Sequence, residues 1–399
     1  MKTTRPGLTL LLLLLVCTGC RESREAYLKT VLNNLEQIET ASYNEFTEGW
    51  EPGDTAAIRN TRFIEEYRNP ADTAIGAAYV SFESRDTSRL SFAYDGNVRA
   101  LVYSDVKGIV IDDFTSRQLP FRPVNPPFFN YAESILRYAL ETTDSITVEW
   151  QDMGPDYRFR LVIHEPEKIE FFGKAFRWPN NPYTGDPTSA YELWIRKADR
   201  LPYKIRREMS HNLNNRTCTD VEFNRLSLGD LDIYAYFPAG YEIRKYGEKK
   251  GDAPGSGLLG KPAPGWELSD WNGRSVTLAG LKEKVVVMNF TGIGCGPCKA
   301  AIPFLNGLKG QFAPGEVALI AIESWGKQPH SLEIYAGKYH INYPFVCGTD
   351  KVLTQYLGGS RGVPVFFVLD EKRTVRQIIR GYNPDTTGND LTNAISGLL

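Results

Sequence analysis

Two cysteines separated by only a glycine and a proline, Cys295 and Cys298, narrow the possible folds of this chain more than any other stretch. An apolar run over 285–290 predicts a buried strand before the pair, and a helical pattern follows it. A cysteine that begins a helix is favoured as thiolate, because unpaired backbone N–H groups and the helix dipole stabilise negative charge. The second cysteine, three residues on, shares its helical face and can reach the first sulfur. Pro297 is tolerated in a first helical turn. The pattern indicates dithiol–disulfide exchange.

Other roles fit this pair less well. A zinc site needs a second ligand pair at comparable spacing, and the 6 cysteines and 4 histidines of the chain offer none, so we expect no metal. A structural disulfide could share the spacing but would not explain the strand–turn–helix context. The net charge of −2 argues against nucleic acid as a main partner.

The N-terminus has the pattern of an export signal. Lys2 and Arg5 precede an apolar run over 8–16 that is too short to span a bilayer comfortably. Small residues then lead to Cys20, after which the chain turns polar. This resembles a bacterial lipoprotein signal over 1–20, which implies that Cys20 is lipidated, although Cys17 stands where that motif usually has leucine. An ordinary cleaved signal and an uncleaved anchor are the alternatives. Each places the mature chain outside the cytoplasm, where disulfides persist.

Residues 21–246 are predicted to form an α+β domain with a curved antiparallel sheet and two helices on its concave face. Apolar spacing predicts helices over 21–42 and 129–141. Asp95, Gly96 and Asn97 predict a hairpin turn, and another turn is expected over 212–215. Period-two alternation predicts strands over 78–82, 90–94, 98–103, 108–112, 146–150, 157–164, 191–195, 202–205 and 218–226.

This first domain resembles the half-barrel of the bacterial lipoprotein carriers of the LolA/LolB-like type. The resemblance is carried by the pattern over 191–204 and by Phe237-Pro238 followed by 240–243. It implies a possible hydrophobic ligand, although aromatic residues in such a stretch more often form sheet core. No catalytic constellation is visible in the domain.

A glycine-rich stretch over 247–258 is a linker by composition, and a second domain follows over 259–399. It is predicted to be α/β, with a mixed sheet covered on both faces. Its strands are expected over 285–290, 317–322, 365–369 and 374–379, and its helices over 298–312, 331–339, 351–356 and 390–399.

Several motifs of the second domain resemble, in order and spacing, the thioredoxin-like TlpA/ResA-type proteins. They are 261–264, 266–268, 281–285, 289–290, 295–298, 302–303, 362–364 and 381–382. The resemblance implies a thioredoxin-like fold without cofactor, in which Cys295 attacks a disulfide and Cys298 resolves the mixed disulfide. Gly296 and Pro297 shape the site. It also implies a cis bond between Val363 and Pro364 that faces the cysteines and docks substrate.

Two of these motifs allow another reading, one for Pro364 and one for the cysteine pair. Pro364 could simply begin the strand that follows it. Peroxiredoxins share this fold, but they place threonine three residues before their cysteine, whereas Thr291 is four before Cys295.

The sequence departs from the family pattern at residues that, in the family, contact the substrate or assist proton transfer at the cysteine pair. Gly294 stands where the family usually has tryptophan, so a flat apolar surface for substrate is expected to be missing. Asn289 replaces the buried acidic residue of thioredoxin, and Ala301 replaces a glutamate that assists proton transfer. Glu323 could substitute for these carboxylates but is more simply a polar strand end.

Cys218 and Cys347 are interpreted as small buried residues, although a bond between them is not excluded.

These observations predict a thiol:disulfide oxidoreductase of the cell envelope that reduces protein disulfides. Its expected partners are disulfide-containing envelope proteins, an upstream thiol reductant and, through a lipid anchor, a membrane. The alternative is a lipid or lipoprotein binding protein in which the half-barrel is the functional part and the redox domain is accessory.

Overall fold

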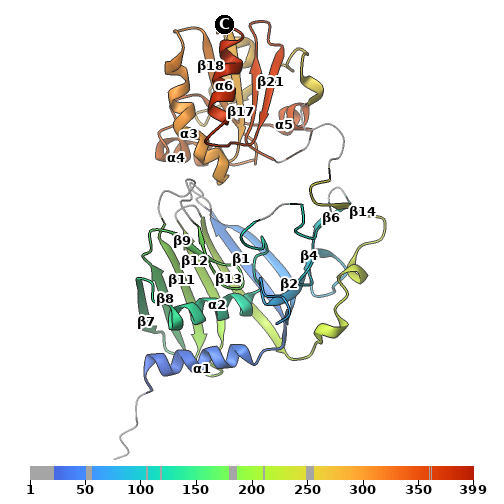
Figure 1. Ribbon diagram of the computed structural model, residues 1–399, viewed down its shortest axis with the longest axis vertical. Coiled ribbons are helices and arrows are strands. Elements are labelled where there is room, and N and C mark those ends of the chain that lie inside the picture. Colours follow the sequence, from blue (N-terminus) through green and yellow to red (C-terminus); the bar gives the residue numbers. More distant parts are fainter. Residues whose placement is uncertain are drawn as a thin grey trace, which may run out of the picture.

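The computed structural model of the protein (Figure 1) describes residues 22–50, 56–104, 107–116, 119–178, 187–209, 212–248, 256–358, 360 and 362–399. The predicted signal with Cys17 and Cys20 lies outside the described residues, as does most of the predicted linker. Within the described ranges, no helix has both the length and the apolar character needed to cross a membrane.

A twelve-stranded sheet dominates the N-terminal part of the chain. Its strand order is β14-β6-β5-β4-β3-β2-β1-β13-β12-β11-β8-β7, and neighbouring strands are antiparallel except β14 and β6. In the described part of the chain the sheet stays open, with β14 and β7 at its edges, so the half-barrel remains a prediction. The strands are β1 (Thr40–Trp50), β2 (Ile58–Arg68), β3 (Ala77–Phe82), β4 (Leu90–Tyr94), β5 (Arg99–Tyr103), β6 (Gly108–Asp112), β7 (Ile146–Asp152), β8 (Asp156–Ile163), β11 (Ser189–Arg196), β12 (Pro202–Met209), β13 (Asn212–Phe223) and β14 (Glu242–Lys245).

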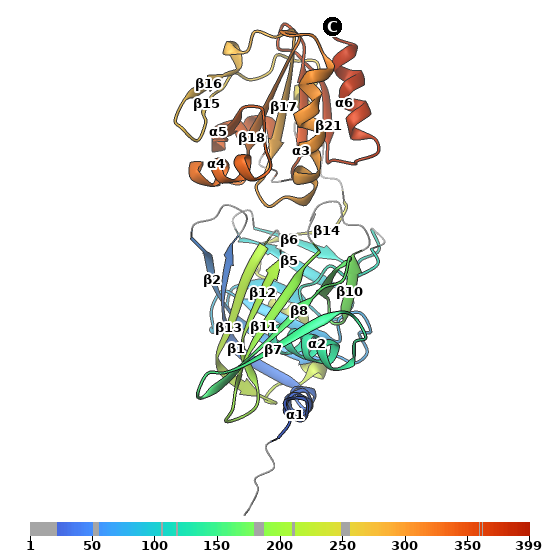
Figure 2. The same ribbon diagram turned by 90° about the vertical axis from the view of Figure 1, so that its left-hand side faces the viewer.

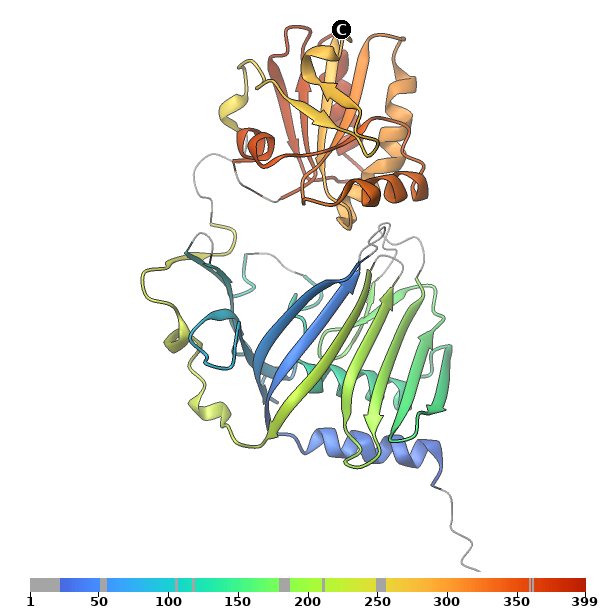
Figure 3. The same cartoon turned by 180° about the vertical axis from the view of Figure 1, so that it is seen from behind.

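Two helices, α1 (Arg24–Glu36) and α2 (Phe128–Glu141), pack on one face of this sheet, which we call the inner face. Figure 3 shows the opposite face, with α2 behind the strands. A separate hairpin of β9 (Lys168–Phe171) and β10 (Ala175–Trp178) also contributes to this core. Alternate residues of β8, from Phe159 to Ile163, point into it, because successive side chains of a strand face opposite sides.

Some sequence predictions for this region hold and others are wrong. The second helix and the turn at Asp95 are confirmed, since the Asp95 carboxylate accepts the N–H groups of Asn97 and Val98 between β4 and β5. The first helix ends at Glu36 instead of near residue 42, and β1 begins at Thr40. The stretch 212–215 is the start of β13, not a turn. Strands β1 and β2 were missed because many of their residues are polar, which hides the apolar alternation.

The N-terminus of α2 is fixed by side chains of the sheet. Its N-cap residue, Pro127, makes no side-chain capping bond. Instead, the Glu66 carboxylate accepts the N–H groups of Phe129 at 3.1 Å and Asn130 at 2.7 Å, and the Tyr43 hydroxyl accepts that of Phe128 at 2.9 Å. Tyr43 also donates to Glu66 at 2.7 Å. Burial raises the pKa of Glu66, while these hydrogen bonds favour its charged form. The helix is thus tied to β1 and β2.

The C-terminal part contains a five-stranded sheet of order β19-β18-β17-β20-β21, with β19, β18 and β17 parallel and β20 and β21 antiparallel. Helices α3, α4 and α6 pack on one face, where α3 and α6 lie side by side (Figures 1 and 2), and α5 packs on the other. The predicted α/β fold is confirmed. Its elements are β15 (Glu267–Ser269), β16 (Ser275–Thr277), β17 (Val285–Thr291), α3 (Gly296–Leu308), β18 (Val317–Glu323), α4 (Pro329–Lys338), β19 (Phe345–Cys347), α5 (Asp350–Leu357), β20 (Val365–Leu369), β21 (Val375–Arg380) and α6 (Thr387–Ser396).

We expect Glu66→Ala to lower the free energy of unfolding by about 3 kcal/mol, because buried donors at the start of α2 lose their acceptor. Urea unfolding followed by circular dichroism measures the change. Glu222→Ala on β13 is the control. This exposed carboxylate pairs with Arg85 at 3.4 Å, its one ion pair among the described residues, and its loss should change stability by less than about 0.5 kcal/mol. Equal effects of the two substitutions would contradict the capping role of Glu66.

Candidate functional site

The cysteine pair lies where β17 passes into α3. Cys295 is the N-cap residue of the helix, and its sulfur accepts the backbone N–H of Cys298 at 3.2 Å. The two cysteines form a disulfide with their Cα atoms 5.2 Å apart. Gly296 and Pro297 form the first turn of α3 between them. Cys295 is 6% exposed and Cys298 only 2%, so Cys295 is the more exposed of two buried residues.

A distant segment of the chain meets Cys295. The peptide bond between Val363 and Pro364 is cis, as predicted, and the Cys295 sulfur lies 3.7 Å from the carbonyl oxygen of Val363. β20 begins directly after this proline and pairs with β17, with Val365 opposite Phe290. The sheet register thus brings together the six residues predicted for the site, which are 295–298 and 363–364.

The residue before the pair, Gly294, has a backbone conformation that explains the missing tryptophan. Its φ is +90°, in the region where a Cβ atom collides with the backbone. A bulky tryptophan would be strained there. The absence of tryptophan at position 294 therefore agrees with the backbone conformation there.

An aromatic side chain nevertheless packs on the segment that leads to the pair: Trp325, from the loop between β18 and α4. A Cβ atom added to Gly292 would lie only 2.6 to 2.9 Å from three atoms of the Trp325 indole, so the ring packs directly against this glycine. The Gly292 carbonyl accepts the N–H of Cys295 at 3.2 Å, which links this contact to the cysteine. The Trp325 side chain is partly exposed. The sequence prediction of a missing aromatic surface overlooked this residue, because nothing in the sequence places it near Cys295.

Glu323 holds the loop that carries Trp325. It is the last residue of β18, the polar strand end expected from the sequence, and it is buried. One carboxylate oxygen accepts the N–H groups of Trp325 at 2.9 Å and Lys327 at 3.0 Å, while the other has no hydrogen-bond partner among the described residues. Burial raises the pKa of Glu323. The carboxylate therefore serves first as an anchor for the loop.

Two other positions expected to differ from the family are buried in the core. Asn289 is 2% exposed within β17, and its side-chain oxygen has no hydrogen-bond partner in the described part of the chain. Ala301 is fully buried on α3.

The two remaining described cysteines lie outside this arrangement. Cys218 is buried in β13 on the inner face of the N-terminal sheet, and Cys347 ends β19. Both are free, so no bond joins them. Burial raises the pKa of each thiol, which makes them poor nucleophiles.

Comparison with known proteins agrees with the geometry. The profile of the AhpC/TSA family matches residues 259–378. The thiol-disulfide oxidoreductase ResA of Bacillus subtilis (strain 168) is 29% identical over 137 residues, which cover 34% of this chain and 75% of that protein. ResA of Geobacillus thermodenitrificans (strain NG80-2) is 32% identical over 124 residues, 31% of this chain and 70% of that protein. A thioredoxin-family thiol:disulfide interchange protein of Chlorobium tepidum TLS, solved by crystallography, is 23% identical with a TM-score of 0.30 over 37% of this chain and 99% of its own.

The fold and these relatives define a thioredoxin-like oxidoreductase. Through its C-terminal part, the chain belongs to the family of ResA thiol-disulfide oxidoreductases.

We expect Trp325→Ala to lower kcat/KM for reduction of insulin about two- to tenfold, because a protein substrate loses an aromatic contact. Reduction of the small disulfide DTNB should be unchanged. Gly292→Ala should reproduce the effect, since the added methyl group displaces the indole. Trp194→Ala, a partly buried tryptophan on β11, serves as the control. Equal losses for insulin and DTNB would show that Trp325 only supports the fold.

Proposed function

We propose that this protein reduces disulfides of other proteins in the cell envelope, with Cys295 as the attacking thiolate and Cys298 as the resolving thiol. The observation that carries the proposal is the place of the Cys295 sulfur, at the N-terminus of α3 and 3.7 Å from the Val363 carbonyl. The helix N-terminus favours the thiolate once the pair is reduced. The Gly-Pro spacer resembles that of reducing thioredoxins, which favours reduction of the substrate over its oxidation.

The exchange proceeds in two balanced steps. The Cys295 thiolate attacks one sulfur of the substrate disulfide, forms a mixed disulfide and releases the other substrate sulfur as thiolate. Cys298 then attacks Cys295, which frees the second substrate thiol and leaves the Cys295–Cys298 disulfide. The substrate gains two electrons, and an upstream dithiol restores the pair by the reverse exchange. The Cys295–Cys298 disulfide of the structure corresponds to the oxidised end of this cycle.

The segment at 363–364 is proposed to dock the substrate. Val363 presents its carbonyl group beside the Cys295 sulfur, where an extended substrate segment can donate a backbone N–H. Pro364 leads directly into β20, and Gly296 and Pro297 form the first turn of α3 after Cys295. This arrangement recognises backbone, so it suits several client proteins.

We further propose that the chain is anchored to a membrane by a lipid on Cys20 and faces the periplasm. The basic start, the short apolar run and the small residues before Cys20 support this assignment. In the same proposal, 21–246 form one domain, 247–258 a linker and 259–399 the redox domain. The flexible composition of the linker would let the dithiol reach clients at some distance from the membrane.

We expect Cys295→Ala to abolish insulin reduction and Cys298→Ala to accumulate mixed disulfides with client proteins, because the resolving thiol is gone. Non-reducing electrophoresis and mass spectrometry of the trapped complexes identify the clients. Cys347→Ala is the control, since this free thiol lies outside the pair. Retention of full activity by both active-site variants would refute the proposal.

Cys20→Ser should move the protein from the membrane fraction to the soluble periplasmic fraction, because the acyl chains that hold it are lost. Fractionation and immunoblotting measure the distribution, and mass spectrometry of the intact chain detects the lipid. Cys17→Ser is the matched control and should remain membrane-bound. Identical fractionation of the Cys20 variant and the wild type would contradict the anchor.

A further inference from the structure

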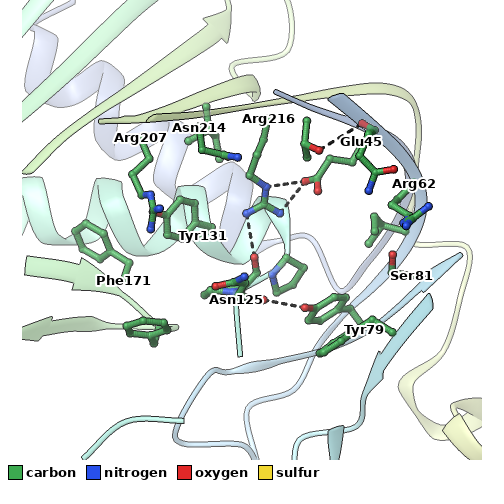
Figure 4. Close-up of a pocket in the computed structure, with 18 of the residues that line it drawn as sticks. Glu45, Arg62, Tyr79, Ser81, Asn125, Tyr131, Phe171, Arg207, Asn214 and Arg216 are labelled. Atoms are coloured by element: carbon green, nitrogen blue, oxygen red, sulfur yellow. Dashed lines mark hydrogen bonds and ion pairs between the residues drawn. The ribbon is translucent and has the colours of Figure 1, made fainter. Parts of the chain in front are cut away.

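A cavity of about 320 Å³ opens on the inner face of the N-terminal sheet, beside the start of α2. Its walls come from β1, β2, β3, β4, β12 and β13 of the sheet, from the segment before α2 and the start of α2, and from the β9–β10 hairpin. Figure 4 shows most of these residues. Its volume is at the small end of the range for organic ligand sites. The lining is charged as well as aromatic, which is unusual for a protein core.

Two arginines of this lining are neutralised by carboxylates. Arg216 of β13 pairs with Glu45 at 2.7 Å and donates to the Pro126 carbonyl at 3.0 Å. Arg207 of β12 pairs with Glu170 of the β9–β10 hairpin. The side chains of Glu45 and Glu170 are each only 10% exposed. Glu170 also pairs with the buried Lys168 at 3.3 Å. Because these pairs are largely desolvated, both carboxylates are held in place and already compensated by cations.

A third arginine in the lining, Arg62 of β2, has no ion-pair or hydrogen-bond partner for its side chain among the described residues, although its surface is only partly exposed. It lies opposite Glu45 in the register of β1 and β2, but that carboxylate is occupied by Arg216. A guanidinium keeps its charge at any physiological pH. Three arginines therefore face two glutamates across one cavity, and the excess positive charge suits an anion.

A second cavity of about 500 Å³ shares the Phe172 side chain with the first. Arg122 and Lys174 line it together with aromatic side chains. The Phe121 ring stacks on that of Phe172 at 4.6 Å and lies tilted to that of Phe176 at 4.8 Å. A charged chamber thus adjoins an aromatic one through a shared side chain. This order of surfaces matches a molecule with one anionic end and one apolar end.

We propose that the two cavities bind a single-chain amphiphile whose carboxylate pairs with Arg62 and whose apolar tail lies along Phe172 and Phe121. The planar guanidinium matches a carboxylate with two parallel hydrogen bonds. The aromatic chamber removes the tail from water. This site is separate from the cysteine pair and does not depend on the proposed reductase activity.

Dodecanoate is a suitable probe for the site. The purified full chain is freed of bound lipid on a hydrophobic resin and titrated calorimetrically with dodecanoate below its micelle concentration. Dodecanol, which has the same tail without charge, and acetate, which has the headgroup alone, are titrated in parallel. We expect dodecanoate to bind at least tenfold more tightly than either, because only it combines a carboxylate for Arg62 with a tail for the aromatic chamber.

Arg62→Gln should weaken dodecanoate binding about ten- to a hundredfold, since a charged hydrogen-bonded partner is lost. Its binding of dodecanol should not change. Arg59→Gln is the matched control: Arg59 lies on the same strand, is 63% exposed and pairs with Glu48 at 3.1 Å. Circular dichroism and insulin reduction verify that each variant is folded and redox-active.

Three outcomes would overturn the proposal: no binding of dodecanoate, equal affinity for dodecanoate and dodecanol, or equal loss of affinity in the Arg59 and Arg62 variants. A loss of insulin reduction in the cysteine variants with dodecanoate binding intact would leave both assignments standing, so the failure of one is distinguishable from the failure of the other.

Discussion

The pairing of β17 with its two neighbours is the constraint on which the redox site depends. β17 runs parallel to β18, with Thr291 opposite Glu323, and antiparallel to β20, with Phe290 opposite Val365. The end of β17, the end of β18 and the start of β20 therefore meet at one edge of the sheet. Cys295, the Trp325 loop and Pro364 follow from these three strand ends. Since every residue of β17 is buried, a slip by one position would exchange its two core faces.

The N-terminal sheet has a different constraint. Its inner face carries polar groups as well as apolar core residues, and the polar groups need partners. Near α2, Glu66 and Tyr43 use their oxygen atoms to satisfy the first N–H groups of the helix. Further along the same strands, Glu45 and Arg62 line the cavity instead. An isolated buried charge is strongly unfavourable, so such side chains persist where a helix end, an opposite charge or a ligand compensates them. The capped helix end in turn forms one wall of the cavity.

How much of this could be predicted from the sequence differs between the two parts. In the C-terminal part, the apolar strands and the Cys-Gly-Pro-Cys spacing sufficed for the α/β fold and for the cysteine pair, and family resemblance supplied the cis bond at Pro364. In the N-terminal part, β1 and β2 were hidden because many of their residues are polar, including Glu45, Arg62 and Glu66 on the inner face. Trp325 and Gly292 lie in the loops that follow two neighbouring strands, β18 and β17. Their contact leaves no periodic signal in the sequence. Local patterns report burial, but such tertiary contacts depend on sheet register.

The two glycines near the cysteines and Trp325 form one physical unit. The φ angle of +90° at position 294 is unfavourable for any residue with a large side chain, so a glycine precedes Cys295. Gly292 leaves the space that a Cβ atom would take, and the indole of Trp325 fills it from the neighbouring strand's loop. That loop is held by the buried Glu323 carboxylate. The aromatic side chain near the cysteine loop thus comes from the next β–α loop, and its position depends on a hydrogen-bonded carboxylate and not on the residue that precedes Cys295.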